Sequence, residues 1–346
     1  PMTIPFRVGM TLGAYDGYID QMLEDAALAE RLGYDDVWFG DVGAPDALTT
    51  AAVVADRTST VRIGTAVTPV FTRTPAVLAA TSATLQQLSG GRFMLGLGSS
   101  SEKMVEQWHG LSFDHPLARV RETTELVRRL LQGEKSEFSG RTLSSHGYRQ
   151  AAVTDQVPIY LAALRPKMLR LAAELGDGVV FNFFPKSALP QILEYVHEGA
   201  CDGGKAPGDV EVVCRFQVAV TDQVSEHVDY LRYFLAPYFS QSVYNHFLAW
   251  CGYQEMASII ADGWAKKDRE QTMNALTDDL IHDISVIGDR DYCQARIREY
   301  AQMGIHTHII SCPSLDPETR LRTFSAFGRD VFDFEGTQPM ASTRAG

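Results

Sequence analysis

The sequence predicts a closed (β/α)8 barrel of the α/β class, with eight parallel strands surrounded by helices. Short apolar runs typical of buried strands alternate with longer segments of helical periodicity, and eight such runs can be counted. The chain has 346 residues. A barrel needs roughly 250, which leaves about 96 for insertions. We therefore expect residues 1–346 to form a single decorated barrel domain.

The expected strands are short, and the helices between them begin and end at capping residues. Ile19, Met22 and Leu23 fall on one face of the first helix, which ends near Gly33. Thr74 suits the N-cap of a later helix, because a proline follows it. Repeated βα units imply parallel strands with the helices outside. The eight strands are expected at residues 6–11, 36–40, 61–67, 92–98, 158–162, 178–182, 210–220 and 307–311.

Two segments exceed a minimal barrel. Residues 136–150 predict a hairpin inserted before the fifth strand, and residues 223–300 predict a mostly helical insertion before the last strand. The aromatic residues of the second insertion either pack helix against helix or cover the mouth of the barrel, and the sequence leaves both interpretations open. These residues are Tyr230, Tyr233, Phe234, Tyr238, Phe239, Tyr244, Phe247 and Trp250.

Composition excludes several classes of partner. The 31 Lys and Arg residues against 43 Asp and Glu give a formal net charge of −12, which provides no overall attraction to nucleic acid. No apolar run approaches the roughly 20 residues of a membrane-spanning helix, and residues 1–3 do not begin a signal peptide. The five cysteines lack the spacing of a disulfide framework or a zinc site. We expect a cytoplasmic protein with a small-molecule substrate, no nucleic-acid or membrane partner, and no metal.

Chemistry in such a barrel is expected where the strands end. The residues there are mostly small, which lets a flat ligand approach the backbone. They form no Ser-His-Asp set, G-x-S-x-G turn or metal-ligand cluster, so the sequence disfavours a hydrolase or a metalloenzyme. Residues 96–101 (GLGSSS) lack the third glycine of a dinucleotide-binding motif. Ser99 and Glu102 match a capping box, which is an alternative to a ligand or proton-transfer role for Glu102.

An anion site is expected after the fifth strand, at Leu164, Arg165, Pro166 and Lys167. A proline at the first helical position places the free backbone N–H groups of the helix toward the barrel mouth, where two cations accompany them. The alternative is that both cations are simply solvated. In a chain of charge −12, this is where we expect a phosphate to bind.

Asp41 and His109 are further candidates for chemistry, whereas the two histidines near the last strand are not. Asp41 ends an apolar strand, where a buried carboxylate needs partners, so it is either a ligand contact or a cap. His109 follows the fourth strand and is either catalytic or a structural hydrogen-bonding group. His306 and His308 flank the last strand without a third metal ligand, and we expect both to be structural.

A series of motifs runs along the chain in a fixed order, from Arg7 to about Phe327. They are residues 64–69 (GTAVTP), 73–76 (RTPA), 89–98 (SGGRFMLGLG), 108–110 (WHG), 116–119 (PLAR), 158–163 (PIYLAA) and 176–178 (GDG). In order and spacing this series resembles the luciferase-like flavin and deazaflavin oxidoreductases. It is most similar to the branch that depends on coenzyme F420, a deazaflavin.

The resemblance implies a homodimeric barrel that holds its cofactor at the carboxyl-terminal mouth. It also implies a bulge with a non-proline cis peptide, by position Ala66–Val67, behind the middle ring of the cofactor. By matching motif positions, the cofactor site would be lined by Asp41, Thr65, Ala66, Val67, Gly98, Ala162, Ala163 and Arg165. We add Ser99, Leu164, Pro166 and Lys167 to this expected set from their position at the strand ends.

Two positions depart from the dehydrogenases of this family. Those enzymes have a histidine after the aspartate that matches Asp41, where this chain has Val42, and Ser101 and Glu102 both compete to match their catalytic glutamate. We expect hydride transfer between reduced F420 and a C=C, C=O or C=N group. Glu102 or His109 is the expected proton donor, and Asp41 a second candidate. A two-component monooxygenase using FMNH2 and O2 is the alternative, and a non-catalytic flavin-binding protein a further one.

Overall fold

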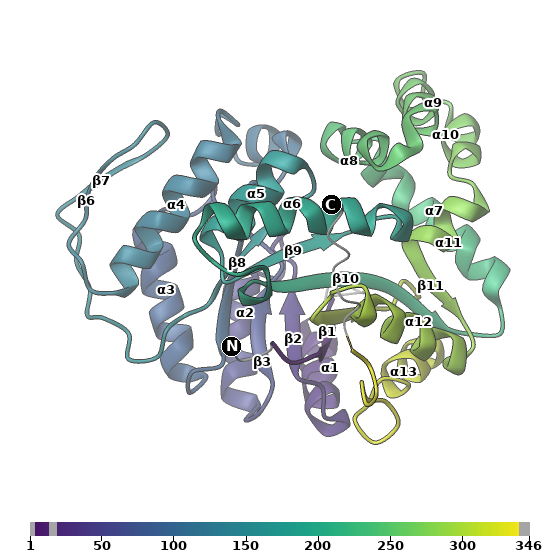
Figure 1. Cartoon of the computed structure of the whole chain (residues 1–346), viewed down its shortest axis with the longest axis horizontal. Coiled ribbons are helices and arrows are strands. Elements are labelled where there is room, and N and C mark those ends of the chain that lie inside the picture. The colour runs from purple at the N-terminus through teal and green to yellow at the C-terminus, as the bar shows by residue number, and fades with distance from the viewer. Residues whose placement is uncertain (1–3, 14–18, 339–346) are drawn as a thin grey trace.

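Eight parallel strands close into a barrel, as the sequence predicts (Figure 1). The computed structural model describes residues 4–13 and 19–338, so the sequence expectation for residues 1–3 lies outside the described part. The last strand pairs with the first, Arg7 opposite Thr307 and Met10 opposite Ile310, which closes the barrel. Around the barrel the order is β1 (Arg7–Leu12), β2 (Asp36–Phe39), β3 (Arg62–Thr65), β5 (Phe93–Gly98), β8 (Ile159–Ala162), β9 (Gly178–Asn182), β10 (Glu211–Val220) and β12 (Thr307–Ser311).

Helices cover the outside of the barrel and begin where local capping chemistry predicts. Thr74 caps α3, with its hydroxyl accepting from Val77 N at 3.5 Å, and Pro75 is the first helical residue. A buried ion pair between Asp25 and Arg320, at 2.6 Å, joins the first and last of these helices. They are α1 (Ile19–Leu32), α2 (Ala47–Arg57), α3 (Pro75–Leu88), α4 (Pro116–Leu131), α5 (Pro166–Leu175), α6 (Leu189–Asp202), α12 (Arg290–Gln302) and α13 (Pro317–Ser325). Short helical turns lie at Lys103–Trp108, Lys186–Ala188, Pro207–Asp209 and Ala249–Tyr253.

Residues 136–150 contain an antiparallel hairpin, β6 (Glu137–Ser139) and β7 (Ser144–His146). Figure 1 shows it at the left edge of the molecule, beside α4 and far from the helices at the upper right. The carboxylate of Glu122 on α4 holds the hairpin turn, accepting from Arg141 N at 2.6 Å and Thr142 N at 2.9 Å. The hairpin therefore packs on the outer surface, and Arg119 joins its turn to the loop after the third strand by donating to Thr142 O at 2.8 Å and to Val70 O at 3.2 Å.

The large insertion ends earlier than the sequence analysis places it. Five helices follow β10 and pack around a second apolar cluster, which includes Leu231, Leu235 and Ile281 and extends to Ala219 of β10. Residues 285–300, which we assign from sequence to the insertion, belong instead to the barrel layer, because β11 (Ser285–Gly288) pairs in parallel with the end of β10 and α12 follows it. The five helices are α7 (Val224–Phe239), α8 (Ser242–Leu248), α9 (Gln254–Ala265), α10 (Arg269–Ala275) and α11 (Asp278–Ile284).

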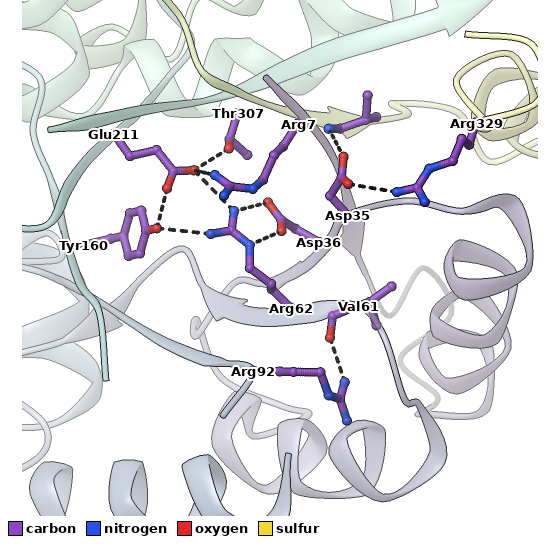
Figure 2. A network of polar contacts seen from close by, with 11 residues as sticks. Arg7, Asp35, Asp36, Val61, Arg62, Arg92, Tyr160, Glu211, Thr307 and Arg329 are labelled. Carbon is purple, nitrogen blue, oxygen red and sulfur yellow. Dashed lines mark hydrogen bonds and ion pairs between the residues drawn. The ribbon is translucent and has the colours of Figure 1, made fainter. Parts of the chain in front are cut away.

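The barrel interior is charged at the amino ends of the strands and apolar in its middle. At the amino ends of the strands, charged side chains form the network of Figure 2, in which Arg62 contacts both Asp36 and Glu211. Burial alone raises the pKa of the Glu211 carboxyl, but Arg62, Thr307, Arg7 and Tyr160 outweigh it and leave the pKa below its ordinary value. The middle is an apolar layer of Trp38, Met94, Tyr160, Val180, Val213 and Ile309. These two layers fill the barrel below its carboxyl-terminal mouth.

The two histidines near the last strand are structural, as expected. His306 Nδ1 accepts from Val212 N at 3.0 Å. His308 contacts Arg7 O at 3.2 Å and stacks on Phe216, with ring centroids 5.8 Å apart. Burial lowers the pKa of His308 to about 3. Both rings therefore serve packing and backbone hydrogen bonding.

The five cysteines differ in their burial. Cys214, Cys293 and Cys312 are buried, Cys251 is partly buried and Cys201 is exposed, and all five are free thiols. None of the helices in the described ranges combines the length and apolar character needed to cross a bilayer. Within residues 4–13 and 19–338, no group of His, Cys, Asp or Glu side chains is arranged to hold a metal ion.

Candidate active site at the barrel mouth

A backbone bulge lies at the carboxyl end of β3. The peptide bond Ala66–Val67 is cis, at the position that the family resemblance implies. Directly after it, β4 (Thr68–Pro69) pairs with the end of β5, Thr68 opposite Leu97. Ala66 also packs against the apolar layer inside the barrel. The bulge therefore forms a wall of the mouth immediately above the filled interior.

Thr65 differs from the expected role, because its side chain belongs to the sheet. Its hydroxyl donates to Gly96 O and accepts from Gly96 N, both at 2.9 Å. The residue is fully buried. Thr65 thus fixes β3 against β5 where the bulge interrupts their backbone pairing, and its fully buried hydroxyl has already used its one donor hydrogen within the sheet.

The mouth is lined by residues with little or no side chain. A Cβ added to Gly40 would meet no atom within 4 Å, so the space above it is open. A Cβ on Gly98 would lie 2.6 Å from Val67 Cγ2 and 3.2 Å from Ala162 Cβ, so the bulge, β5 and β8 approach closely. Open space over a small-residue wall fits a flat ring system.

Asp41 is buried at the end of β2 and is bound by Arg73 from the loop after β4. Burial raises the pKa of the Asp41 carboxyl, against the effect of the guanidinium. Arg73 also pairs with Asp46, the N-cap of α2. Arg73 belongs to one of the motifs of the sequence (residues 73–76), but is not among the site residues predicted from sequence. Its position between a strand end and a capped helix is the signal that could have revealed it.

The turn after β8 has the geometry of an anion site. Arg165 is the N-cap residue of α5, has extended backbone angles and provides no side-chain cap, and Pro166 is the first helical residue. Arg165 and Lys167 are exposed, and Ala162 and Leu164 are partly buried beside them, whereas Ala163 is buried. The free N–H groups at this helix end, the helix dipole and the two cations together favour an anionic group.

The segment after β5 holds the two expected proton donors, and both are exposed. Glu102 and His109 flank a π-helical turn, Lys103–Trp108. The capping box expected at Ser99 does not form, because the helical turn starts later, and Ser101 Oγ accepts from Met104 N at 3.4 Å. Ser100 adopts a left-handed φ of 64°. Irregular turns of this kind are frequent at functional sites.

Aromatic rings of the insertion reach the mouth at the end of β9. Phe183 has a left-handed φ of 52°, which is uncommon for a bulky residue. Its ring lies 4.9 Å from that of Tyr238 and 5.6 Å from that of Tyr244, and the guanidinium of Arg215 lies 5.5 Å from its centroid. Tyr244 also contacts Asn182 Oδ1 at 3.5 Å. Tyr238 and Tyr244 thus pack the insertion against the end of β9.

The surface has another hollow, of about 580 Å³, away from the bulge. It lies between the end of β10, α12 and α13, and its charged lining includes Asp222, Arg290, Asp291 and Arg322. Those charges pair with one another, Arg290 with Asp291 at 3.2 Å and Arg322 with Asp222 at 3.9 Å. The lining of this hollow includes none of the predicted site residues. We therefore place the candidate site at the barrel mouth, where those residues lie.

Comparison with known proteins agrees with this geometry. The model of the luciferase-like monooxygenase family matches residues 2–307. The chain belongs to this family. Among the relatives of this luciferase-like protein is the 5,10-methylenetetrahydromethanopterin reductase of Methanolobus tindarius, which is 29% identical over 309 residues and covers 88% of this chain and 94% of its own. The F420-dependent glucose-6-phosphate dehydrogenase of Segniliparus rotundus is 28% identical over 350 residues, covering 95% and 98%.

Solved structures support the fold of this luciferase-like protein. The coenzyme F420-dependent tetrahydromethanopterin reductase of Methanopyrus kandleri superposes with a TM-score of 0.79 at 21% identity, over 94% of this chain and 98% of that one. A more distant structure is an FMN-bound Baeyer–Villiger monooxygenase from Pseudomonas putida, with a TM-score of 0.72 at 18% identity, covering 94% and 97%. The overall fold is therefore shared with both an F420-dependent and an FMN-bound enzyme.

Proposed function

We propose that this protein is an oxidoreductase that transfers hydride between reduced coenzyme F420 and an organic substrate with a C=C, C=O or C=N group. The observation that carries the proposal is the wall of small residues at the mouth, where Gly98 approaches Val67 and Ala162 and the space over Gly40 is open. Relatives that are named as F420-dependent and span nearly the whole chain support the choice of cofactor.

The residues at the mouth fit such a cofactor. The wall of Ala66, Val67, Gly98 and Ala162 suits a flat tricyclic ring. Thr11 Oγ1 at the end of β1 is buried and has no hydrogen-bond partner, so a ligand can satisfy it. When bound, the deazaflavin supplies the hydride chemistry.

The acidic tail of the cofactor would bind where β8 meets α5. Ala163, Leu164, Arg165, Pro166 and Lys167 form this turn, in which Arg165 and Lys167 are two exposed cations and the first turn of α5 has free backbone N–H groups. We place Ser99 beside the ring, at the end of β5. Asp41 would contact the cofactor through the carboxylate oxygen that Arg73 does not bind. Thr65 would contact it only through backbone atoms, because its hydroxyl is bonded within the sheet.

The chain must also handle one proton. Glu102 and His109 stand at the two ends of the turn after β5, and both side chains are exposed. We propose that one of them donates the proton to the reduced substrate. Asp41 is the less suitable donor, because its carboxylate is already engaged by Arg73.

Titration of the purified protein with F420, and separately with FMN, tests the cofactor. Quenching of tryptophan fluorescence should reveal micromolar binding of F420. Micromolar binding of FMN without F420 binding would overturn the proposal. Turnover of a candidate acceptor by reduced F420 under nitrogen then separates an enzyme from a binding protein. Gln substitution of Glu102 and of His109 should cut turnover by about 100-fold at the true donor and leave binding intact.

A monooxygenase using FMNH2 and O2 is the second candidate. It is favoured by the description of the matching family and by the FMN-bound neighbour of the same fold. Consumption of O2 with reduced FMN would select it.

Two further properties follow from the family and from the cysteines. We propose a homodimer, which light scattering of the eluted protein tests. Five free thiols support a reducing, cytoplasmic location, which fractionation of the source cells tests.

A further inference from the structure

Arg215 faces the barrel mouth from the side opposite the bulge. Side chains on a strand alternate, and Glu211 on the same strand points into the barrel. Val213 belongs to the interior apolar layer, so Arg215 points inward as well, one level higher. In the closed strand order, β10 lies four strands from β3 in either direction. Arg215 and the Ala66–Val67 peptide therefore face each other across the mouth.

The structure gives Arg215 no carboxylate partner among the described residues. Its Nε is buried and lacks a hydrogen-bond acceptor, and its guanidinium lies against the Phe183 ring. Glu211 cannot serve it, because four residues of strand span about 13 Å. The inward arginines at the other end of the barrel differ: Arg7 and Arg62 both reach Glu211, at 3.3 and 3.2 Å.

An arginine keeps its charge under all ordinary conditions, and a partly buried one without an acceptor is costly. Its planar fork matches the oxygens of a carboxylate or a phosphate. Phe183 is held in a left-handed conformation beside it, and Tyr238 and Tyr244 pack around that ring. The surroundings thus combine one unpaired cation with an aromatic wall.

We propose that Arg215 is the binding residue for an anionic oxygen group of the substrate, and that the aromatic wall of Phe183, Tyr238 and Tyr244 holds an apolar body beside that group. The substrate class is then an apolar or aromatic acid, with its charge on the β10 side of the mouth and its reducible bond toward the bulge. That this ligand is the substrate rests on the function proposed above. The anion site itself does not depend on the cofactor.

Calorimetric titration of the whole, cofactor-free protein tests the site with simple probes. Benzoate and phenyl phosphate carry the two candidate anions, and benzamide is their neutral counterpart. We expect one of the anions to bind, and Arg215→Gln to weaken it by about 10- to 100-fold. Benzamide should bind equally to both proteins. Arg215→Lys keeps the charge and should retain part of the affinity, which separates loss of the site from loss of the fold.

Arg298→Gln is the matched control, since Arg298 also lies over an aromatic ring, Phe332, at 4.6 Å, but on the outer helix α12. The inference is overturned if neither anion binds, if Arg215→Gln binds them as the wild type does, or if Arg298→Gln loses the same affinity. It is also overturned if Arg215→Gln weakens F420 by the same factor, because Arg215 would then face the cofactor. If F420 does not bind but the anion still binds through Arg215, the proposed function is wrong and the anion site remains.

Discussion

Asp41 and Arg73 form a buried ion pair that ties the end of β2 to the loop following the cis-peptide bulge. The two residues are 32 positions apart in sequence. Asp41 is 6% exposed and Arg73 20%, so water screens the pair only partly. The pair fixes one corner of the mouth.

Removing the Asp41 charge should therefore destabilise the protein. In Asp41→Asn, Arg73 keeps only the exposed carboxylate of Asp46. A double-mutant cycle of Asp41→Asn and Arg73→Met, measured by urea unfolding, should give a coupling energy of about 1–3 kcal/mol. The exposed pair of Arg129 and Glu134 is the control and should give less than about 1 kcal/mol. Equal coupling in the two cycles would remove the structural role assigned to Asp41.

Gly40→Ala should separate binding from stability. The added methyl meets no atom within 4 Å in the free protein, so the unfolding midpoint should stay close to that of the wild type. The same methyl would occupy the open space of the mouth, and F420 affinity should fall by about 10-fold or more in the fluorescence titration. Gly208→Ala, also without neighbours but on a surface turn, should change neither. Unchanged F420 affinity in Gly40→Ala would mean that the ring binds elsewhere.

Local chemistry explains why much of the fold could be predicted. Apolar runs and the Thr74–Pro75 cap are properties of neighbouring residues, and they place strands and helix starts correctly. The family resemblance, not spacing, supplied the cis peptide. The pairing of Arg73 with Asp41 and the position of Arg215 over Phe183 depend on how distant strand ends meet, which no local pattern records. The end of the insertion is not visible in the sequence because β11 belongs to no repeated βα unit of the closed barrel and is defined by its pairing with the far end of β10.

Glu211→Gln should reduce stability without touching the site. At the end of the barrel opposite the mouth, the Glu211 carboxylate forms ion pairs with Arg7 and Arg62 and accepts hydrogen bonds from Tyr160 and Thr307. Loss of its charge leaves two partly buried guanidinium groups with less compensation, and unfolding should become easier by about 3 kcal/mol. F420 affinity should not change.

The same substitution should alter acid unfolding. The pKa of Glu211 lies below its ordinary value of 4.5 in the folded protein, so its contribution is complete above that pH and is lost as the pH falls below it. The stability of Glu211→Gln should therefore depend less on pH below about 4.5. Tyr160→Phe removes one hydrogen bond of 2.7 Å and keeps the charge, so it should retain the acid dependence. A wild-type acid profile in Glu211→Gln would contradict this assignment.

His308 should make the protein sensitive to a milder range of acid. Its pKa falls from 6.5 in the unfolded chain to about 3 in the folded protein because of burial, so the unfolded chain binds one more proton between those values. Stability should then decline as the pH falls below about 6.5, by on the order of 1.4 kcal/mol for each pH unit from this group.

Phenylalanine fits the same surroundings, since His308 already packs against Phe6, Phe216 and Phe334. Urea unfolding of His308→Phe between pH 4.5 and 6.5, above the range in which Glu211 titrates, should therefore show a shallower decline than the wild type. His306, whose pKa burial also lowers, supplies part of the slope that remains. His146→Gln changes an exposed histidine on the hairpin and should keep the full wild-type slope, so equal slopes in all three proteins would exclude His308 as the source.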